Sequence, residues 1–140
     1  MSVSYILDKK ALSFLWVNCG GNEDDIPLPL YEKNEPTDFP KITERLKKLG
    51  LLHTLGKRID VERTIGFLIE SMIAAEQVDL IGTMVVFHCK KLVVAAEEDG
   101  FSDKKCRLVP MKNNEELEKY LAEQNEDISY EEDSDEFYNS

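Results

Sequence analysis

Apolar residues recur every three or four positions at three places in the first half of the chain, which predicts three helices. The first covers residues 8–18, with Asp8 as its N-cap. The second covers residues 38–49, and the third begins at Asp60. The apolar stripes are Leu12, Leu15 and Trp16; then Ile42, Leu46 and Leu49; then Val61, Ile65, Leu68, Ile69, Met72 and Ile73.

The periodicity changes in the second half, where β-branched residues become frequent. Residues 78–89 and 92–97 predict two strands joined by a turn at Lys90-Lys91, and residues 104–109 predict a third. Both strands of this hairpin are apolar on both faces, although an antiparallel hairpin with one wet face normally alternates apolar and polar residues. Two explanations stay open. Either the chain's own helices cover both faces, or one face is left as a docking surface for another protein or a second copy.

A final helix is expected from Asn113 or Asn114, either of which can act as its N-cap, to about Ala122. The expected fold is therefore α+β, with three N-terminal helices, an antiparallel three-stranded sheet and a C-terminal helix. Residues 1–124 would form the single domain, and residues 125–140 an acidic, disordered tail. Between the first two helices, the prolines of residues 26–30 predict an extended strip packed on the body.

Much of the net charge of −11 is local, because eight acidic and no basic residues lie between Glu123 and Ser140. The preceding 122 residues carry only −3. A chain without an excess of basic residues binds the phosphates of nucleic acid poorly, so we expect no nucleic-acid partner. The second helix does carry a basic surface, which a solvated helix face explains better than DNA recognition does. Its basic residues are Lys41, Arg45, Lys47 and Lys48.

The side chains that carry chemistry do not form a recognisable site. Three cysteines without CxxC spacing argue against a disulfide framework and favour a reducing compartment. His88 and Cys89 are adjacent in a predicted strand and point to opposite faces, so they cannot readily share a metal ion or form a nucleophile pair. With no phosphate loop, secretory signal or apolar membrane span either, we expect a cytoplasmic protein that is not an enzyme and needs no cofactor or metal.

Several landmarks, taken in order, resemble the EspG-type secretion-associated proteins of type VII (ESX) secretion and their Firmicutes relatives. The resemblance covers roughly residues 8–122 and is one of spacing and residue class. It rests on Ala11-Leu12-Ser13-Phe14-Leu15-Trp16, Pro27-Leu28-Pro29-Leu30, Arg45 with Leu49-Gly50-Leu51, Glu76-Gln77-Val78-Asp79-Leu80, the hairpin, Arg107-Leu108-Val109-Pro110 and Tyr120-Leu121.

The resemblance implies a cytosolic chaperone that holds a helical secretion substrate before export, without catalysis or cofactor. It implies that an apolar helical tip of the substrate is capped against the sheet, and our candidate partner-binding residues are Met84, Val86, His88 and Val94. Members of that family are about twice as long and are built from two similar halves, so this chain corresponds to one half. Either a homodimer restores the missing half, or the chain is a single-half relative with another task.

The leading functional hypothesis is an adaptor or chaperone for a secreted helical protein. The alternative is an immunity protein that inhibits a toxin by direct binding, which the small size and the acidity of the chain favour. A third hypothesis is a winged-helix regulator built on the second and third helices and the hairpin, against which the net charge argues.

Overall fold

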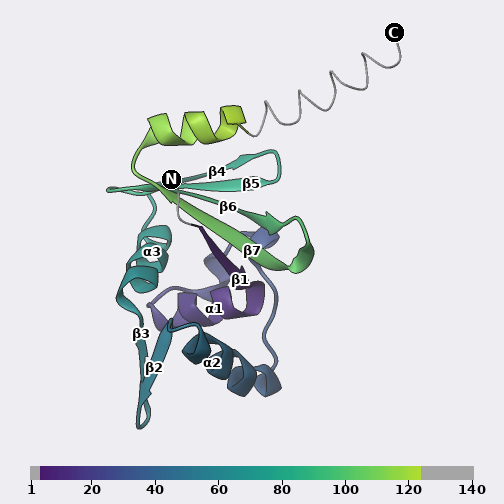
Figure 1. The fold of residues 1–140 in the computed structure, drawn as a ribbon, viewed down its shortest axis with the longest axis vertical. Helices are drawn as coiled ribbons and strands as arrows, with labels where there is room; N and C mark the ends of the chain where they lie inside the picture. The colour runs from purple at the N-terminus through teal and green to yellow at the C-terminus, as the bar shows by residue number, and fades with distance from the viewer. Residues whose placement is uncertain (1–3, 124–140) are drawn as a thin grey trace, which may run out of the picture.

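The computed structural model describes residues 4–123, which form an antiparallel five-stranded sheet with helices on both faces (Figure 1). The strand order is β1-β7-β6-β5-β4. The strands are β1 (Tyr5–Asp8), β4 (Gln77–Ile81), β5 (Met84–His88), β6 (Val93–Asp99) and β7 (Ser102–Met111). The helices are α1 (Lys9–Asn18), α2 (Phe39–Lys48), α3 (Arg63–Ile73) and a last described helix of residues 114–123, which we call helix 114–123.

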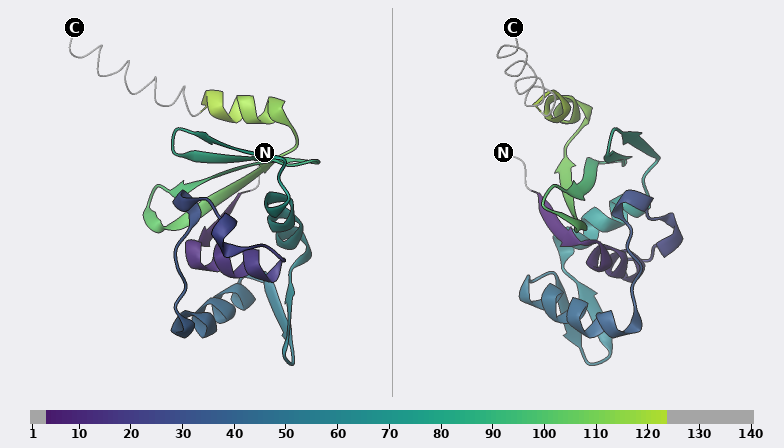
Figure 2. Two further views of the ribbon diagram at one scale, coloured as in Figure 1. Left: turned by 180° about the vertical axis from the view of Figure 1, so that it is seen from behind. Right: turned by 90° about the vertical axis from the view of Figure 1, so that its right-hand side faces the viewer.

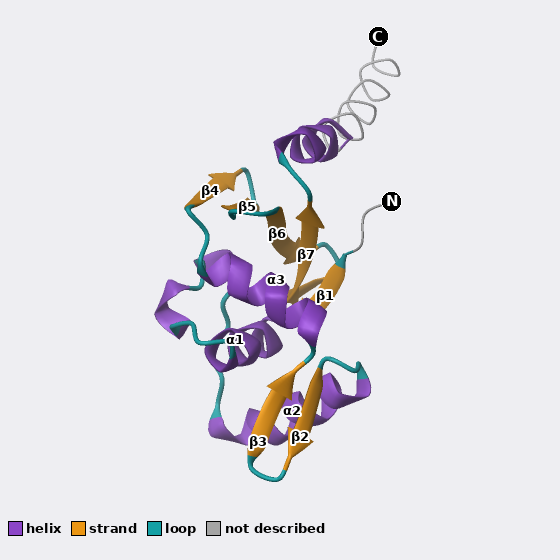
Figure 3. Ribbon diagram, turned by 90° about the vertical axis from the view of Figure 1, so that its left-hand side faces the viewer, coloured by secondary structure: helices purple, strands orange, loops and turns teal. Residues whose placement is uncertain are grey.

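A second, two-stranded sheet lies at the end of the molecule that α2 occupies, away from helix 114–123 (Figures 1 and 3). It is the hairpin of β2 (Leu52–Leu55) and β3 (Arg58–Val61), which connects α2 to α3. The two views of Figure 2 show the same long arrangement, with helix 114–123 at one end and the β2–β3 hairpin at the other.

The α+β class predicted from the sequence is correct, but the three-stranded sheet is wrong. Residues 78–89 do not form one strand, because the two-residue turn Gly82-Thr83 divides them into β4 and β5, which pair with each other. Gly82 has a φ of +63°, a conformation that a turn of this length requires and that glycine adopts without strain. The sheet gains its other unexpected strand from β1, which pairs with β7.

The start of the third helix is also corrected. Asp60 does not begin it, because Asp60 lies in β3 opposite His53. The helix starts at Arg63, and the carboxylate of Glu62 accepts hydrogen bonds from the backbone N–H groups of Thr64 and Ile65. These N–H groups lack partners within the helix, which is why a cap at this position stabilises it.

The other helices lie where the sequence predicts them. α1 and α2 begin and end within about two residues of their expected bounds, and Gly50 follows α2 with a φ of +73°. Asn113 caps helix 114–123, since its Oδ1 accepts a hydrogen bond from the N–H of Glu116. The proline strip differs from expectation, because Leu28–Leu30 form a short 3₁₀ helix, η2, and only Leu30 of these is buried. The predicted tail, residues 125–140, lies outside the described residues.

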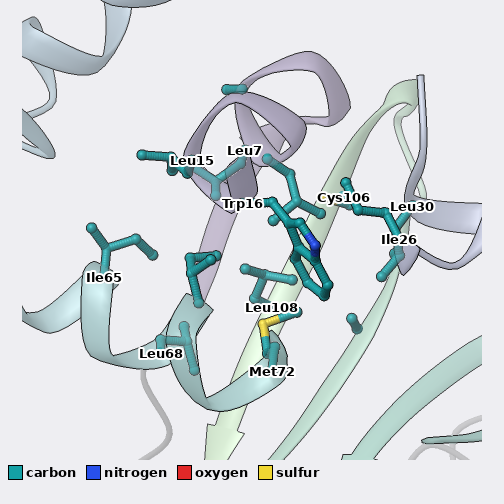
Figure 4. Packing of buried hydrophobic residues seen from close by; sticks show 14 of the residues in the cluster. Leu7, Leu15, Trp16, Ile26, Leu30, Ile65, Leu68, Met72, Cys106 and Leu108 are labelled. Carbon is teal, nitrogen blue, oxygen red and sulfur yellow. The ribbon is translucent and has the colours of Figure 1, made fainter. Parts of the chain in front are cut away.

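The main core lies between one face of the sheet and helices α1 and α3 (Figure 4). Trp16 stands near its centre, with its indole Nε1 donating a hydrogen bond to the carbonyl of Asn22 and its ring 6.3 Å from that of Phe87. Gly21 lies so close to this ring that a Cβ there would meet Trp16 at 2.5 Å. The loop after α1 therefore packs so closely against the indole of Trp16 that position 21 has no room for a side chain.

A second, smaller core lies on the opposite face of the sheet, under helix 114–123. Leu117 is 6% exposed and packs on the sheet, and Tyr120 and Leu121 extend the contact. Its sheet residues are Met84, Val86, Val93, Ala95, Val109 and Met111. Helices of this one chain therefore cover both faces of the apolar hairpin.

Candidate functional site: the β4 edge of the sheet

The four candidate partner-binding residues do not form one exposed surface. Met84 and Val86 are 6% and 0% exposed and lie beneath helix 114–123. Val94 is also 0% exposed, but it lies in the main core on the other face. The reason is register, since Val94 pairs with Phe87 and not with Val86. Only His88 reaches solvent, with a side chain that is 28% exposed.

The apolar surface that stays exposed lies beside these residues, on β4. Leu80 is 67% exposed, Val78 48% and Ile81 43%. β4 is the last strand of the sheet, with β5 on one side and no strand on the other among residues 4–123. An edge strand that combines unpaired backbone groups with apolar side chains is a template for pairing with another chain.

The backbone of β4 offers its free hydrogen-bonding groups at the same residues. Ile81 and Met84 flank a two-residue turn and so form a hydrogen-bonded pair of the hairpin. Pairs in an antiparallel ladder alternate, so the N–H and C=O groups of Val78 and Leu80 point away from β5. These two residues therefore present both an apolar side chain and an available backbone to a partner.

The single charged residue of β4 is Asp79, and two neighbouring side chains contact its carboxylate. Its carboxylate accepts a hydrogen bond from the amide of Gln77, and one of its oxygens lies 2.9 Å from Nε2 of His88. The hydrogen bond from Gln77, followed by the contact with His88, lowers the pKa of Asp79 below its ordinary value. Charged residues on edge strands usually discourage pairing with another chain. The carboxylate of Asp79 is bound by side chains of β4 and β5 themselves.

The opposite edge of the sheet is less apolar. β1 has four residues, of which Ile6 is 49% exposed and Asp8 pairs with Arg45. Of the two edges of the five-stranded sheet, β4 is therefore the one that exposes more than a single large apolar side chain.

The described side chains that bear thiols are not set up as nucleophiles. Burial raises the pKa of the Cys106 thiol to about 12, and burial also raises the pKa values of Cys19 and Cys89. A thiolate is the reactive form of cysteine, so these environments suppress it. Within residues 4–123, no three His, Cys, Asp or Glu side chains gather closely enough to hold a metal ion.

Sequence reasoning missed the β4 edge because it read β4 and β5 as a single strand. The signal that was present is Gly82-Thr83, a two-residue turn sequence between two apolar runs. With that turn recognised, the first run becomes an outer strand of the sheet.

Comparisons with family models, curated proteins and solved structures find no match to this chain. Across the described part of the chain, none of the helices has the length and apolar character needed to cross a membrane.

Proposed function

We propose that this protein is a non-catalytic adaptor or chaperone that binds another protein along the β4 edge of its sheet. The observation that carries the proposal is the exposure of Val78, Leu80 and Ile81 on an unpaired outer strand. A partner segment in extended conformation would add to β4 through the backbone groups of Val78 and Leu80. Its apolar side chains would then cover those that β4 exposes.

The partner we propose is a secreted, mainly helical protein, held in the cytoplasm before export by a type VII secretion system. The resemblance to the EspG-type proteins supports this choice. The partner would supply the added strand from a segment outside its helices. We place the contact on the outer strand β4 and not at Met84 and Val86, because helix 114–123 covers those two residues.

An immunity protein that inhibits a toxin by direct binding is the second candidate, and the concentration of acidic residues after Glu123 favours it. Acidic residues can occupy a basic active site and speed association with it. An inhibitor of that kind loses affinity and salt sensitivity when residues 125–140 are deleted. A complex held along β4 keeps its affinity after the same deletion.

The test is co-expression of the chain with the proteins that neighbouring genes encode, followed by co-purification. Two variants are compared, Leu80→Lys on β4 and Leu28→Lys on η2, because both leucines are exposed, at 67% and 84%. We expect the wild type and Leu28→Lys to retain a partner and Leu80→Lys to lose at least about tenfold in affinity. Equal retention by the two variants, or no complex with any neighbour, would contradict the proposal.

A further inference from the structure

The positive charge of this acidic chain is concentrated in one segment. Residues 39–63 contain seven basic and three acidic residues, a net charge of +4 in a chain of −11. All seven basic residues are exposed. They are Lys41, Arg45, Lys47 and Lys48 of α2, Lys57 and Arg58 at the turn of the β2–β3 hairpin, and Arg63.

The fold brings these residues together at one end of the molecule, because α2 packs against β2 (Figures 1 and 3). A hollow of about 610 Å³ lies at this end, and its lining contains Lys47, the acidic Asp60, and Leu52, His53, Thr54 and Leu55. A second hollow of about 660 Å³ also borders α2 and has a mixed lining. Its charged residues are Lys10, Lys41, Arg45, Lys48 and Lys104 together with Asp8, Glu32, Asp38 and Glu44. We call α2 and the β2–β3 hairpin together the basic end.

Most of the charge at the basic end is not neutralised by the described residues. Arg45 pairs with Asp8, and Arg58 pairs with Asp60. Among residues 4–123, the lysines of the basic end form no ion pair. These lysines are Lys41, Lys47, Lys48 and Lys57.

The same surface is also apolar. Leu55 is 66% exposed, Leu49 58% and Ile59 38%, and all three lie on or beside the elements that carry the lysines. A ligand that matches this surface needs negative charges with apolar or aromatic side chains between them.

The chain contains such a ligand in residues 124–140. This segment has seven acidic residues and no basic ones. Ile128, Tyr130, Phe137 and Tyr138 are placed among the acids. Its charge and its apolar content therefore both complement the basic end.

The segment that follows helix 114–123 is also long enough for its last residues to reach the basic end. Its 17 residues span at most about 60 Å when extended. A spherical chain of about 120 residues is roughly 35 Å across, and this molecule is longer than a sphere, so at least about ten of the 17 residues are needed to cover the distance. Helix 114–123 lies at the opposite end of the long axis from α2 and β2–β3 (Figure 2). Attachment to the same chain gives it a high effective concentration, which favours binding within one molecule.

We propose that the segment 124–140 binds the basic end of the same molecule through its last residues, with Asp135 and Glu136 against the lysines Lys41, Lys47, Lys48 or Lys57 and with Phe137 and Tyr138 against Leu49, Leu55 and Ile59. The segment and a nucleic acid or other polyanion would then compete for the same lysines. The basic end is therefore a binding site for an acidic, aromatic peptide, and the chain supplies the first occupant.

The test is carbodiimide cross-linking of the full-length chain at low salt, which joins a carboxylate to a lysine amine in direct contact. An equal mixture of ¹⁴N- and ¹⁵N-labelled protein distinguishes links within a molecule from links between molecules. We expect links from residues 124–140 to Lys47, Lys48 or Lys57 within one molecule, reduced about tenfold in 1 M salt.

Two double variants of equal charge change provide the control. Lys47→Glu with Lys48→Glu should reduce the remaining link to Lys57 about tenfold, since the acidic segment is repelled. Lys90→Glu with Lys91→Glu, at the exposed turn between β5 and β6, should leave it unchanged. Links confined to Lys90, Lys91, Lys112 or Lys119, or links between differently labelled copies, would overturn the proposal. A low-salt gel shift of DNA by the full-length chain would also overturn it, because the basic end would then be open.

Discussion

His88 and Asp79 lie diagonally across the β4–β5 hairpin, with Nε2 of the imidazole 2.9 Å from Oδ2 of the carboxylate. The pair lies on the face of the sheet that helix 114–123 covers, at the outer strand, and both side chains keep contact with solvent. Asp79 is the single charged residue of β4. The properties of this edge therefore depend on one carboxylate and the groups that hold it.

Removing that carboxylate should make the β4 edge associate with itself. In Asp79→Ala, two facing copies of β4 no longer bring like charges together, so we expect self-association to become roughly fivefold tighter at pH 7. Sedimentation velocity over a range of concentrations measures the change. Asp103→Ala removes an exposed charge from the start of β7 and serves as the control. The same increase in both variants would show that net charge, and not the edge, is responsible.

The cap of α3 should make stability depend on pH. Hydrogen bonds from the backbone N–H groups of Ile65 and then Thr64 lower the pKa of Glu62 in the folded chain. Because the folded value lies below the unfolded value of about 4.3, the charged cap stabilises the fold above that pH. This stabilisation is lost as the pH falls through the folded value.

We therefore expect Glu62→Gln to lower the Tm by roughly 2–4 °C at pH 7, and we expect this difference to shrink as the pH falls below about 4. Circular dichroism melting curves of the wild type and the variant at a series of pH values provide the measurement. A Tm difference that stays constant with pH would mean that the charge on Glu62 contributes nothing to the cap.

Adding one methyl group at Gly21 should disturb the main core. A Cβ at this position would meet Trp16 at 2.5 Å and Ile73 at 2.9 Å, so the indole has to move. We expect Gly21→Ala to lower the free energy of unfolding by about 2 kcal/mol. The emission of the single tryptophan should shift as its surroundings change. Gly100→Ala, where a Cβ meets nothing within 4 Å, should change neither urea unfolding nor fluorescence.

Truncating Leu117 should open the second core. The side chain of Leu117, on helix 114–123, packs against the sheet and is 6% exposed. Because Leu117→Ala leaves a cavity there, we expect it to lower the free energy of unfolding by about 2–3 kcal/mol. Amide exchange of β5 should accelerate and binding of an apolar dye should increase, because Met84 and Val86 lose their cover. Leu28→Ala, at a leucine that is 84% exposed, is the matched control. Unchanged exchange in β5 would mean that helix 114–123 does not protect the strand.

The helices were predictable from the sequence because each of their signals is local. The stripe of Ile42 and Leu46 in α2 lies within one or two turns, and the cap at Asn113 lies beside the helix it begins. The strands were harder to predict, because a strand is defined by its pairing with residues that can lie far along the chain. β1 has only four residues, and nothing near Tyr5 indicates that it pairs with Leu108.

The same limit explains what could be predicted of the candidate site. The apolar excess of the hairpin is visible in the sequence, and the sheet does bury it on both faces. Which residues share a face follows from register, which the sequence leaves open when both faces are apolar. The sequence therefore predicts Val94 on the same surface as Val86, although Val94 pairs with Phe87, and it gives no signal for the exposed Leu80.

The pairing of β1 with β7 has a consequence for how the chain folds during synthesis. The backbone partners of residues 5–8 are residues 105–108, so the first strand has no neighbour until about a hundred further residues have left the ribosome. Until then, α1 and α3 have only part of the sheet to pack on, and Leu7 lacks its cross-strand partner Cys106. A nascent chain arrested before β7 should therefore be open to proteases and chaperones, and the emergence of β7 should complete the five-stranded sheet in a single late step.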